Sequence, residues 1–443
     1  MIEVFKKTPI FRVIIFLVIL FLLINSVTTV LLYRDRIEDN TSYQVVNFYK
    51  EKRDSAEVVF VGSSNCFSFY SPLFAYNAYG IKTTNFSSSG MGMVAYKYAV
   101  EEVKKTQSKA KIVVTVTPLD EMSYSGLHYL ADYMPWSMNK LNLLKKYFSQ
   151  RNESILNSIE YFIPIMRFHE RWSEVNPVNI KLDDGTKGAT SHIYYLSYVN
   201  DISKDYFVSD EREEIPDDWD SIMNDLLDYC DESNTDIVFL FPPRSYTQEE
   251  YQRLNSLIDL IEKRHYTVMD LRDKLELIGL NPTYDFYDIR HTNVHGSIKY
   301  TDYVIKEVTR HYGLNLEFER DEEYDKAFSV YYEKIRNYVL DVELDMKNRN
   351  YHLNRPELLL QNENDERVSI HWDPIENADG YLVYKNGLNG WELVEDVKDA
   401  TSYTVEGASD DSGLYTVISY RNENGTLKYG NYDYKGIQIG VNQ

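Results

Sequence analysis

The sequence predicts an α/β protein with a three-layer αβα sandwich around a mostly parallel five-stranded sheet. One transmembrane helix precedes this domain, and a small antiparallel β-sandwich follows it. Three observations predict this order: an uncharged apolar segment near the start, apolar runs that alternate with helix-like segments, and short alternating strands from about residue 366. Each pattern is typical of one architecture.

The apolar segment 13–32 reads VIIFLVILFLLINSVTTVLL and carries no charge. A helix needs roughly 20 such residues to cross the hydrocarbon core. Lys6, Lys7 and Arg12 precede it, and basic residues stay on the cytoplasmic side. A cleaved signal peptide would have a shorter apolar region and a small-x-small cleavage site. We therefore expect a single-pass cell-membrane protein with a cytoplasmic N-terminus and an extracytoplasmic main body.

The central region alternates strand-like and helix-like segments. The expected strands are Glu57–Val61, Thr83–Phe86, Lys111–Val116, Asp236–Phe241 and Tyr266–Asp270. The expected helices are Val94–Lys105, Asp217–Asp231, Gln248–Arg264 and Ser297–His311. Strands such as IVVTV and IVFLF are apolar on successive residues, which suits a parallel sheet covered on both faces. Right-handed βαβ connections would then place ligands outside the carboxyl ends of the strands.

The domain boundaries follow from these patterns. Residues 118–216 leave the carboxyl end of the third strand and form an insertion, because ordinary βα loops have about 2–6 residues. We expect this insertion to lie over the ligand crevice. The full division is 1–12 cytoplasmic, 13–32 membrane anchor, 33–54 juxtamembrane linker, 55–316 α/β domain, 317–365 charged helical linker and 366–443 β-sandwich.

Composition excludes some classes of function. The formal net charge is −22, which argues against nucleic acid as a partner because the two would repel each other. Cys66 and Cys230 are the only cysteines, so a cluster of cysteine metal ligands is excluded. One disulfide is possible, but two free buried thiols are the preferred interpretation. Neither a metal nor an organic cofactor is implied.

The stretch VFVGSSNCF places Gly62, Ser63 and Ser64 directly after the first strand. A strand-to-helix turn exposes its residues at the carboxyl edge of the sheet, where backbone amides can stabilise an oxyanion. Serine and glycine are also ordinary turn residues. A serine hydroxyl needs a base to react at neutral pH, so the motif indicates chemistry only if a base is present.

A candidate base lies in YDFYDIRHTNVHG, where Asp288 and His291 are three residues apart. Histidine can take the serine proton, while a carboxylate orients its ring and stabilises the imidazolium. His295 could be the base instead, although the preferred interpretation is that it opens the following helix. Asp285 could replace Asp288 as the orienting carboxylate. The simplest alternative is an aspartate that caps a helix beside a surface histidine.

Together the two motifs resemble the SGNH/GDSL hydrolase superfamily over residues Ser55–Tyr312. GSS stands where that family has Gly-Asp-Ser, which makes Ser64 the matching nucleophile, and DIRH matches its Asp-x-x-His block. The resemblance implies that the amides of Ser64 and Gly90 form the oxyanion hole, with Gly92 as a fallback. TVTPLDEM stands where the family has Gly-x-Asn-Asp, so the third oxyanion donor is unassigned.

Several other residues could contact a substrate. In the insertion, His169, Arg171 and Trp172 could reach the site, although a packed aromatic residue with its ion pair is an equal alternative. Arg290 could bind an anionic group, although an exposed arginine is usually only solvated. We expect Pro242, Pro243 and Arg244, at the end of the fourth strand, to shape the pocket.

The C-terminal segment Glu366–Ile439, with its V-x-I-x-W and YTVISY runs, resembles a fibronectin type III domain. Such domains are mostly spacers, but a glycan-binding or adhesion role is an alternative, with Trp391 as an example of an exposed aromatic residue.

The SGNH resemblance implies a serine esterase or O-acyltransferase that forms an acyl-enzyme on Ser64. Membrane-anchored relatives of this kind act in alginate-type O-acetylation and teichoic-acid D-alanylation. The implied acyl group is acetyl, and the implied acceptor or donor is a cell-envelope or exported polysaccharide. A multi-pass membrane-bound O-acyltransferase is the implied partner. The alternative is a non-hydrolytic accessory protein that docks such an enzyme.

Overall fold

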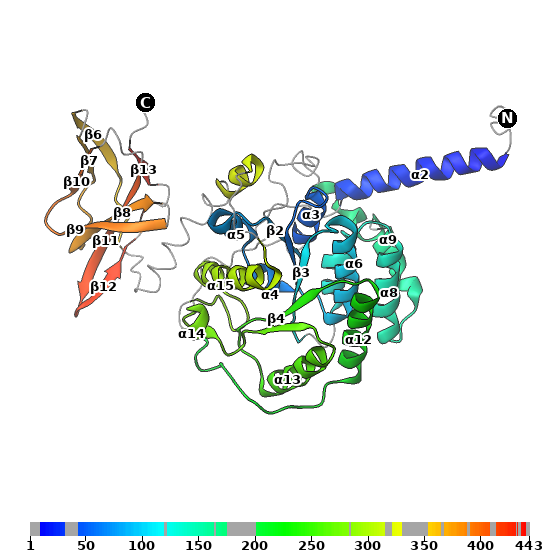
Figure 1. The fold of residues 1–443 in the computed structure, drawn as a ribbon. Coiled ribbons are helices and arrows are strands. Elements are labelled where there is room, and N and C mark those ends of the chain that lie inside the picture. Colours follow the sequence, from blue (N-terminus) through cyan, green and yellow to red (C-terminus); the bar gives the residue numbers. More distant parts are fainter. Residues whose placement is uncertain are drawn as a thin grey trace. The chain divides into compact units, whose positions relative to one another are not determined.

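The computed structural model describes residues 9–31, 43–118, 122–163, 165–174, 201–282, 285–314, 321–329, 353–364, 367–387, 390–407, 413–430, 432 and 436–439. The chain divides into two compact units. The first comprises residues 1–193, 205–279 and 300–327, and the second comprises residues 194–204, 280–299 and 328–443. Figure 1 shows the elements of both units.

The apolar N-terminal segment forms helix α2, Pro9–Leu31. Arg12 is its only charged residue. Among the described residues it is the one helix long and apolar enough to cross a membrane. By length and composition it could be a membrane anchor or a signal sequence.

The first unit contains a five-stranded sheet in the order β2-β1-β3-β4-β5. Its strands are β1 (Val58–Gly62), β2 (Thr83–Ser87), β3 (Lys111–Thr115), β4 (Ile237–Phe241) and β5 (Thr267–Asp270). All four neighbouring pairs are parallel, and Val58 lies opposite both Thr83 and Lys111. The predicted parallel sheet is confirmed, and the predicted strand boundaries differ by one residue at most.

Helices cover both faces of this sheet (Figure 1). One face carries α6 (Tyr96–Thr106), α12 (Asp217–Glu232) and α13 (Gln248–Lys263), which share a core with Val59, Val114 and Phe239. On the other face, α4 (Ser64–Phe69) and α5 (Pro72–Tyr79) are followed much later by α15 (Val294–Tyr312). There the ring of Phe60 stacks on Tyr70 at 3.7 Å, and Phe69 meets Tyr300 edge to face.

The described part of the insertion is helical. It comprises α7 (Tyr124–Ala131), α8 (Met138–Gln150), η2 (Ile155–Ser158), α9 (Ile159–Phe162), α10 (Ile165–Phe168) and η3 (His169–Glu174). Helix α8 packs against α6, and both α10 and η3 pack against α2. Residues 175–200 lie outside the described residues. The predicted position over a ligand crevice therefore stays a prediction for most of the insertion.

Two segments expected to be linkers contribute to the packed units instead. Helix α3 (Tyr43–Lys50) packs on β2, where Phe48 and Phe86 meet edge to face with centroids 4.6 Å apart. Strand β6 starts at Leu359, so the β-sandwich begins before residue 366. Residues 322–329 are helical, and the rest of the charged segment up to residue 352 lies outside the described residues.

The β-sandwich consists of two antiparallel sheets, ordered β10-β7-β6 and β12-β11-β8-β9, with β13 paired to β11. Its strands are β6 (Leu359–Asn364), β7 (Arg367–His371), β8 (Gly380–Gly387), β9 (Gly390–Val397), β10 (Ser402–Glu406), β11 (Leu414–Glu423), β12 (Thr426–Tyr429) and β13 (Ile437–Gln438). Trp372 and Val417 pack between the sheets. Trp391, suggested above as an exposed aromatic residue, is 7% exposed because it packs with Leu382 and Leu414.

Candidate active site

The serine motif lies at the carboxyl edge of the parallel sheet. Gly62 ends β1, and a Cβ there would lie 2.8 Å from the carbonyl oxygen of Thr115 on β3, so only glycine fits. Ser63 caps α4 with an extended backbone, and Ser64 is the first residue of that short helix. In the strand order β2-β1-β3-β4-β5, β2 lies on one side of β1 and the later strands lie on the other, so the topological switch point is between β1 and β3. Ligands of doubly wound folds bind at this switch point.

A hydroxyl network links the ends of β1 and β3. Ser63 Oγ lies 3.0 Å from Thr117 Oγ1, which lies 3.3 Å from the Tyr96 hydroxyl. The Thr117 amide donates to that hydroxyl at 3.1 Å, and the hydroxyl donates to the Thr115 carbonyl at 3.2 Å. Burial raises the pKa of Tyr96 to about 12, so this hydroxyl stays protonated. Sequence reasoning missed Thr117, although its place two residues after β3 was the available signal.

The two serines differ in exposure. Ser63 is 1% exposed, and its Oγ is hydrogen-bonded to Thr117 Oγ1. Ser64 is only partly buried. A nucleophile must be reached by its substrate, so this difference favours Ser64.

The predicted oxyanion glycine, Gly90, lies in a tight turn after β2. The Met91 amide donates to the Ser88 carbonyl at 3.2 Å, and Gly90 has a φ of +67°, which glycine adopts without strain. Within the described residues, no hydrogen bond uses the Gly90 amide. Helix α7 of the insertion packs on this turn, because a Cβ on Gly126 would lie 2.5 Å from the Gly90 carbonyl oxygen.

Asp288 and His291 lie in one short loop of the second unit. His291 Nδ1 lies 2.9 Å from Asp288 Oδ2 and 3.0 Å from Oδ1. The amides of Arg290 and His291 both donate to Asp288 Oδ1, at 2.7 and 2.8 Å. Burial opposes ionisation of Asp288, but these hydrogen bonds and the His291 ring lower its pKa. The carboxylate therefore orients the ring through Nδ1.

The loop is supported by residues of the same sequence motif. Phe286 and Thr292 pair across it in an isolated antiparallel bridge. Asn293 Oδ1 caps α15 by accepting from the Gly296 amide at 3.1 Å, and a Cβ on Gly296 would lie 2.1 Å from the Asp285 carbonyl oxygen. The HTNVHG run thus supplies three features: the candidate base His291, the Asn293 cap of α15, and Gly296, where the backbone lies close to the Asp285 carbonyl.

Asp285, His295 and Cys66 are the alternative site residues that the sequence suggested. Asp285 is buried and accepts from Lys299 Nζ at 2.6 Å and from the Asn281 amide at 2.7 Å, which makes it a structural carboxylate. His295 lies in the first turn of α15, and its side chain lies outside the described residues. Cys66 is buried, and burial raises the pKa of its thiol to about 12, which argues against a thiolate nucleophile.

The proposed substrate-binding residues are dispersed. Arg290 is exposed beside the Asp288–His291 loop. His169 is exposed, and its Nδ1 lies 3.0 Å from the Met166 carbonyl oxygen in the part of the insertion that packs on α2. The side chains of Arg171 and Trp172 lie outside the described residues.

The structure brings Asp288 and His291 together within one unit and places Ser64 and Gly90 in the other. The pairing of Ser64 with His291 therefore stays a prediction. Within the described part of the chain, no group of three or more histidine, cysteine or acidic side chains is arranged to hold a metal.

No protein-family model and no curated protein matches this chain. Solved structures with fibronectin type III domains do. The domain from human collagen XX is 17% identical with a TM-score of 0.16, and the match covers 20% of this chain and 95% of that domain. The Fn3-like protein from Clostridium thermocellum is 15% identical with a TM-score of 0.15, covering 18% of this chain and 88% of that one. The C-terminal β-sandwich is similar to these proteins, and its own strand pairing establishes its two sheets.

Proposed function

We propose that this protein is an extracytoplasmic, membrane-anchored serine esterase or O-acyltransferase of the SGNH type. The observation that carries the proposal is the contact between His291 Nδ1 and Asp288, because it prepares a histidine to act as a base. The partly exposed Ser64 at the switch point of a parallel sheet supplies the matching nucleophile.

The proposed reaction proceeds in two steps. His291 Nε2 takes the proton of Ser64 Oγ, which attacks the ester carbonyl, and the amides of Ser64 and Gly90 stabilise the oxyanion. The intermediate collapses to an acyl-enzyme as the alcohol leaves with the proton from His291. Water or a sugar hydroxyl then attacks the acyl-enzyme and gives its proton to His291. As the bond to Ser64 Oγ breaks, His291 passes that proton to Oγ, and an acid or a new ester is released.

The proposed substrate is an acetyl ester of a cell-envelope or exported polysaccharide, in keeping with the family resemblance. A multi-pass membrane-bound O-acyltransferase is the proposed partner. The alternative function is an accessory protein that only docks such an enzyme. The end of β3 favours that alternative, because Thr117 stands near the place of the family's asparagine and its hydroxyl is engaged by Ser63 and Tyr96.

The deciding experiment treats the full chain, purified in detergent, with a fluorophosphonate, which forms a phosphonyl ester with an activated serine and releases fluoride. We expect labelling at Ser64 that is lost in S64A and H291A and retained in S63A. A folded wild-type protein that is not labelled would overturn the esterase proposal and favour the accessory role. Binding of glycans by the full chain but not by W372A, which disrupts the sandwich core, would indicate a binding function for the β-sandwich.

A further inference from the structure

Two arginines are buried at the carboxyl edge of the sheet, one after each of the last two strands. Arg272 follows β5, and Arg244 follows β4 after two prolines. Their side chains are 2% and 3% exposed. A buried guanidinium is costly unless its donors are paired, so the partners of each indicate its role.

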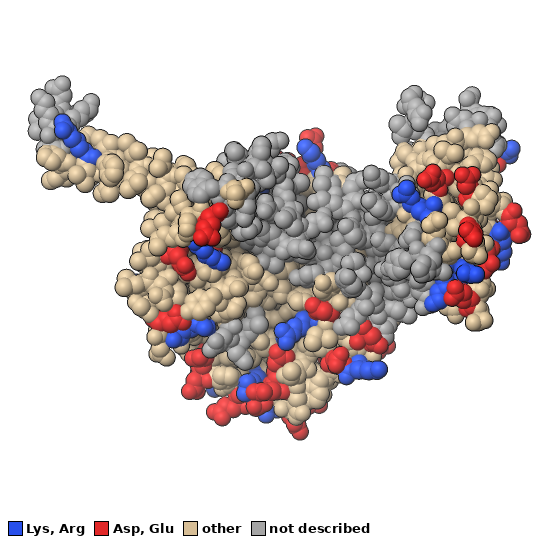
Figure 2. Space-filling view, turned by 180° about the vertical axis from the view of Figure 1, so that it is seen from behind, with Lys and Arg blue, Asp and Glu red and all other residues tan. Residues whose placement is uncertain are grey.

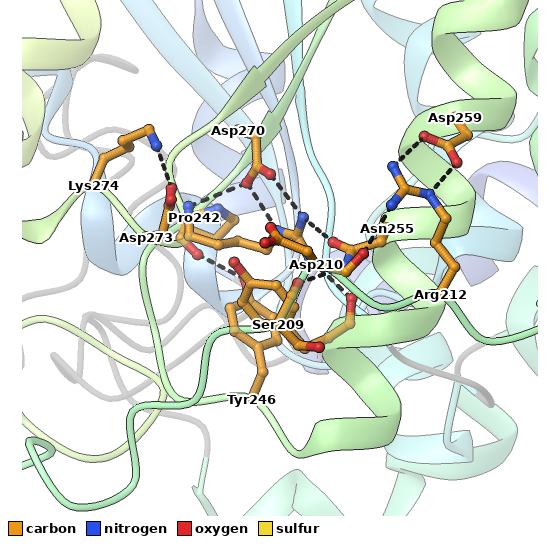
Figure 3. Close-up of polar contacts among 12 residues, drawn as sticks. Ser209, Asp210, Arg212, Pro242, Tyr246, Asn255, Asp259, Asp270, Asp273 and Lys274 are labelled. Atoms are coloured by element: carbon orange, nitrogen blue, oxygen red, sulfur yellow. Dashed lines mark hydrogen bonds and ion pairs between the residues drawn. The ribbon is translucent and has the colours of Figure 1, made fainter.

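Arg272 is fully engaged by its surroundings. It donates to Asp270 through Nε at 2.8 Å and through Nη2 at 2.7 Å, and to Asn255 and the Tyr251 carbonyl at 2.7 and 3.0 Å. Figure 3 shows Asp270 and Asn255 in this network beside the segment of Ser209 and Asp210. The arrangement is that of a structural arginine.

Arg244 has fewer polar partners, namely a hydrogen bond with the Tyr246 side chain and a long ion pair with Glu250. Its Nη2 lies 3.7 Å from Glu250 Oε1, beyond hydrogen-bond distance, and the guanidinium stacks on the Tyr246 ring at 4.3 Å. Glu250 instead takes part in the N-terminal cap of α13, since its Oε2 accepts from the Thr247 amide at 3.0 Å. Among the described residues, the buried Arg244 Nε has no hydrogen-bond partner. A buried cation with an unpaired Nε–H donor at a ligand-binding edge is suited to an anion.

The charge of Arg244 also acts on the hydroxyl network at the switch point. Burial raises the pKa of Tyr96 to about 12, and the positive charge of Arg244 acts on the same hydroxyl in the opposite direction. Tyr96 in turn contacts Thr117, which contacts Ser63 beside the candidate nucleophile. All of these residues belong to the first unit.

We propose that Arg244 binds an anionic group of the substrate, a carboxylate or a phosphate, close to the ester that reacts. Its link to ester chemistry rests on the proposed function, but anion binding itself does not. The substrate would therefore carry a carboxylate or a phosphate group close to the reacting ester, in preference to being a neutral glycan.

The test measures binding of glucuronate and of glycerol phosphate to the full chain in detergent by calorimetry. We expect one probe to bind the wild type and S64A equally, to bind R244Q at least about tenfold more weakly, and R244K at an intermediate level. The probe that binds distinguishes carboxylate from phosphate. R212Q, which removes an exposed ion pair with Asp259, is the control.

Absence of binding of both probes to the wild type, or equal binding by R244Q, would overturn the proposal. The unfolding temperature separates the two buried arginines, because R272Q should lower it while R244Q should not. Loss of stability in R244Q as large as in R272Q would make Arg244 structural and also overturn the proposal. None of these outcomes depends on labelling of Ser64, so the proposed function is tested separately.

A second inference concerns helix α2 and rests on its spanning the membrane. Every residue of Val13–Leu23 is exposed, whereas Thr28 and Leu31 are buried against the protein. From Pro9 to Leu23 the helix is about 22 Å long, which is shorter than the hydrocarbon core of about 30 Å. In Figure 2 the exposed part of α2 carries charge only near its N-terminal end.

The insertion contacts this helix well inside its apolar length. The Trp136 ring meets Phe21 edge to face at 5.1 Å, and Trp136 is itself 51% exposed. Phe168 packs with Leu31 at the end of the helix. The exposed apolar residues of α8, η2, α9 and α10 are Met138, Ile155, Leu156, Ile159 and Met166.

We propose that this apolar surface of α8, η2, α9 and α10 is seated in the lipid of the outer leaflet. It would supply the roughly 8 Å of hydrocarbon thickness that the exposed part of α2 does not cover. The domain would thus rest in the membrane instead of standing above it, which suits an enzyme that receives its acyl group from a membrane partner.

The test places the full chain in phosphatidylcholine–phosphatidylglycerol vesicles with a bimane label on L156C. L277C is the matched control, since Leu277 and Leu156 are 61% and 69% exposed on different helices. We expect brominated lipids to quench bimane at position 156 but not at 277, and iodide in the buffer to do the reverse. Equal quenching of both positions by iodide would overturn the proposal.

Discussion

His291 Nδ1 lies 2.9 Å from Asp288 Oδ2, in a loop that also directs two backbone amides at the same carboxylate. Burial opposes ionisation, yet these contacts lower the pKa of Asp288 from 3.8. A carboxylate with a lowered pKa stabilises the native loop above its ordinary pKa and loses that contribution as the pH falls through the lowered value. We expect an NMR titration to find a midpoint below 3.8 that moves back toward it in H291A.

Replacing Asp288 tests the orienting role. D288N should keep the loop folded but slow fluorophosphonate labelling by about 10²–10⁴-fold, because the ring loses its preferred tautomer and the stabilised imidazolium. Labelling rates of D288N and wild type measured at pH 7 give the comparison. A rate within twofold of wild type would show that Asp288 is not the orienting residue.

The Ser63–Thr117 hydrogen bond is expected to be structural. S63A should lower the free energy of unfolding by about 1 kcal/mol, the usual net value of such a bond, and leave labelling unchanged. S64A should abolish labelling and leave the free energy of unfolding unchanged. Thermal unfolding and labelling of both variants provide the measurement, and loss of labelling in a stable S63A would move the nucleophile to Ser63.

Gly296 is expected to be essential for the loop that carries His291. A Cβ there would lie 2.1 Å from the Asp285 carbonyl oxygen, so G296A should destabilise the protein by about 2 kcal/mol or more through displaced backbone. Gly313 is the control, because nothing lies within 4 Å of its Cβ position and its φ of +62° adds only about 1 kcal/mol of strain for alanine. A G296A protein as stable as G313A would contradict the observed close approach.

Arg272 and Arg212 both form ion pairs with aspartate but differ in burial. R272Q should cost about 3 kcal/mol, because it removes a buried guanidinium and leaves Asn255 and the Tyr251 carbonyl without their donor. R212Q breaks an exposed pair with Asp259 and should cost less than about 1 kcal/mol. The unfolding midpoints in denaturant of the two variants test this order.

Both cysteines should resist modification in the native protein. Burial raises the pKa of Cys66 and of Cys230 to about 12, so neither forms thiolate near neutral pH. Iodoacetamide at pH 8 should leave both unmodified and should alkylate both in denaturant. Rapid reaction of native Cys66 would reveal an access route beside Ser64.

Much of the fold follows from local patterns. The bounds of the parallel strands were predicted within one residue. A strand buried on both faces needs apolar side chains at successive positions, and that run is visible in the sequence. The Asp288–His291 contact was predicted from a spacing of three, which one short loop can accommodate. Helix α3 was missed because YQVVNFYK has a short, mixed pattern whose helical state depends on packing of Phe48 against Phe86.

Local chemistry in the chain therefore accounts for the strands, the serine turn, the histidine loop and the two cysteines as free thiols. Long-range packing decides which of two adjacent serines is buried, since Ser63 meets Thr117 across 54 positions. Long-range packing also gives different polar partners to Arg244 and Arg272, which follow two neighbouring strands. Partners of that kind are set by strand order and helix packing, which no window of neighbouring residues specifies.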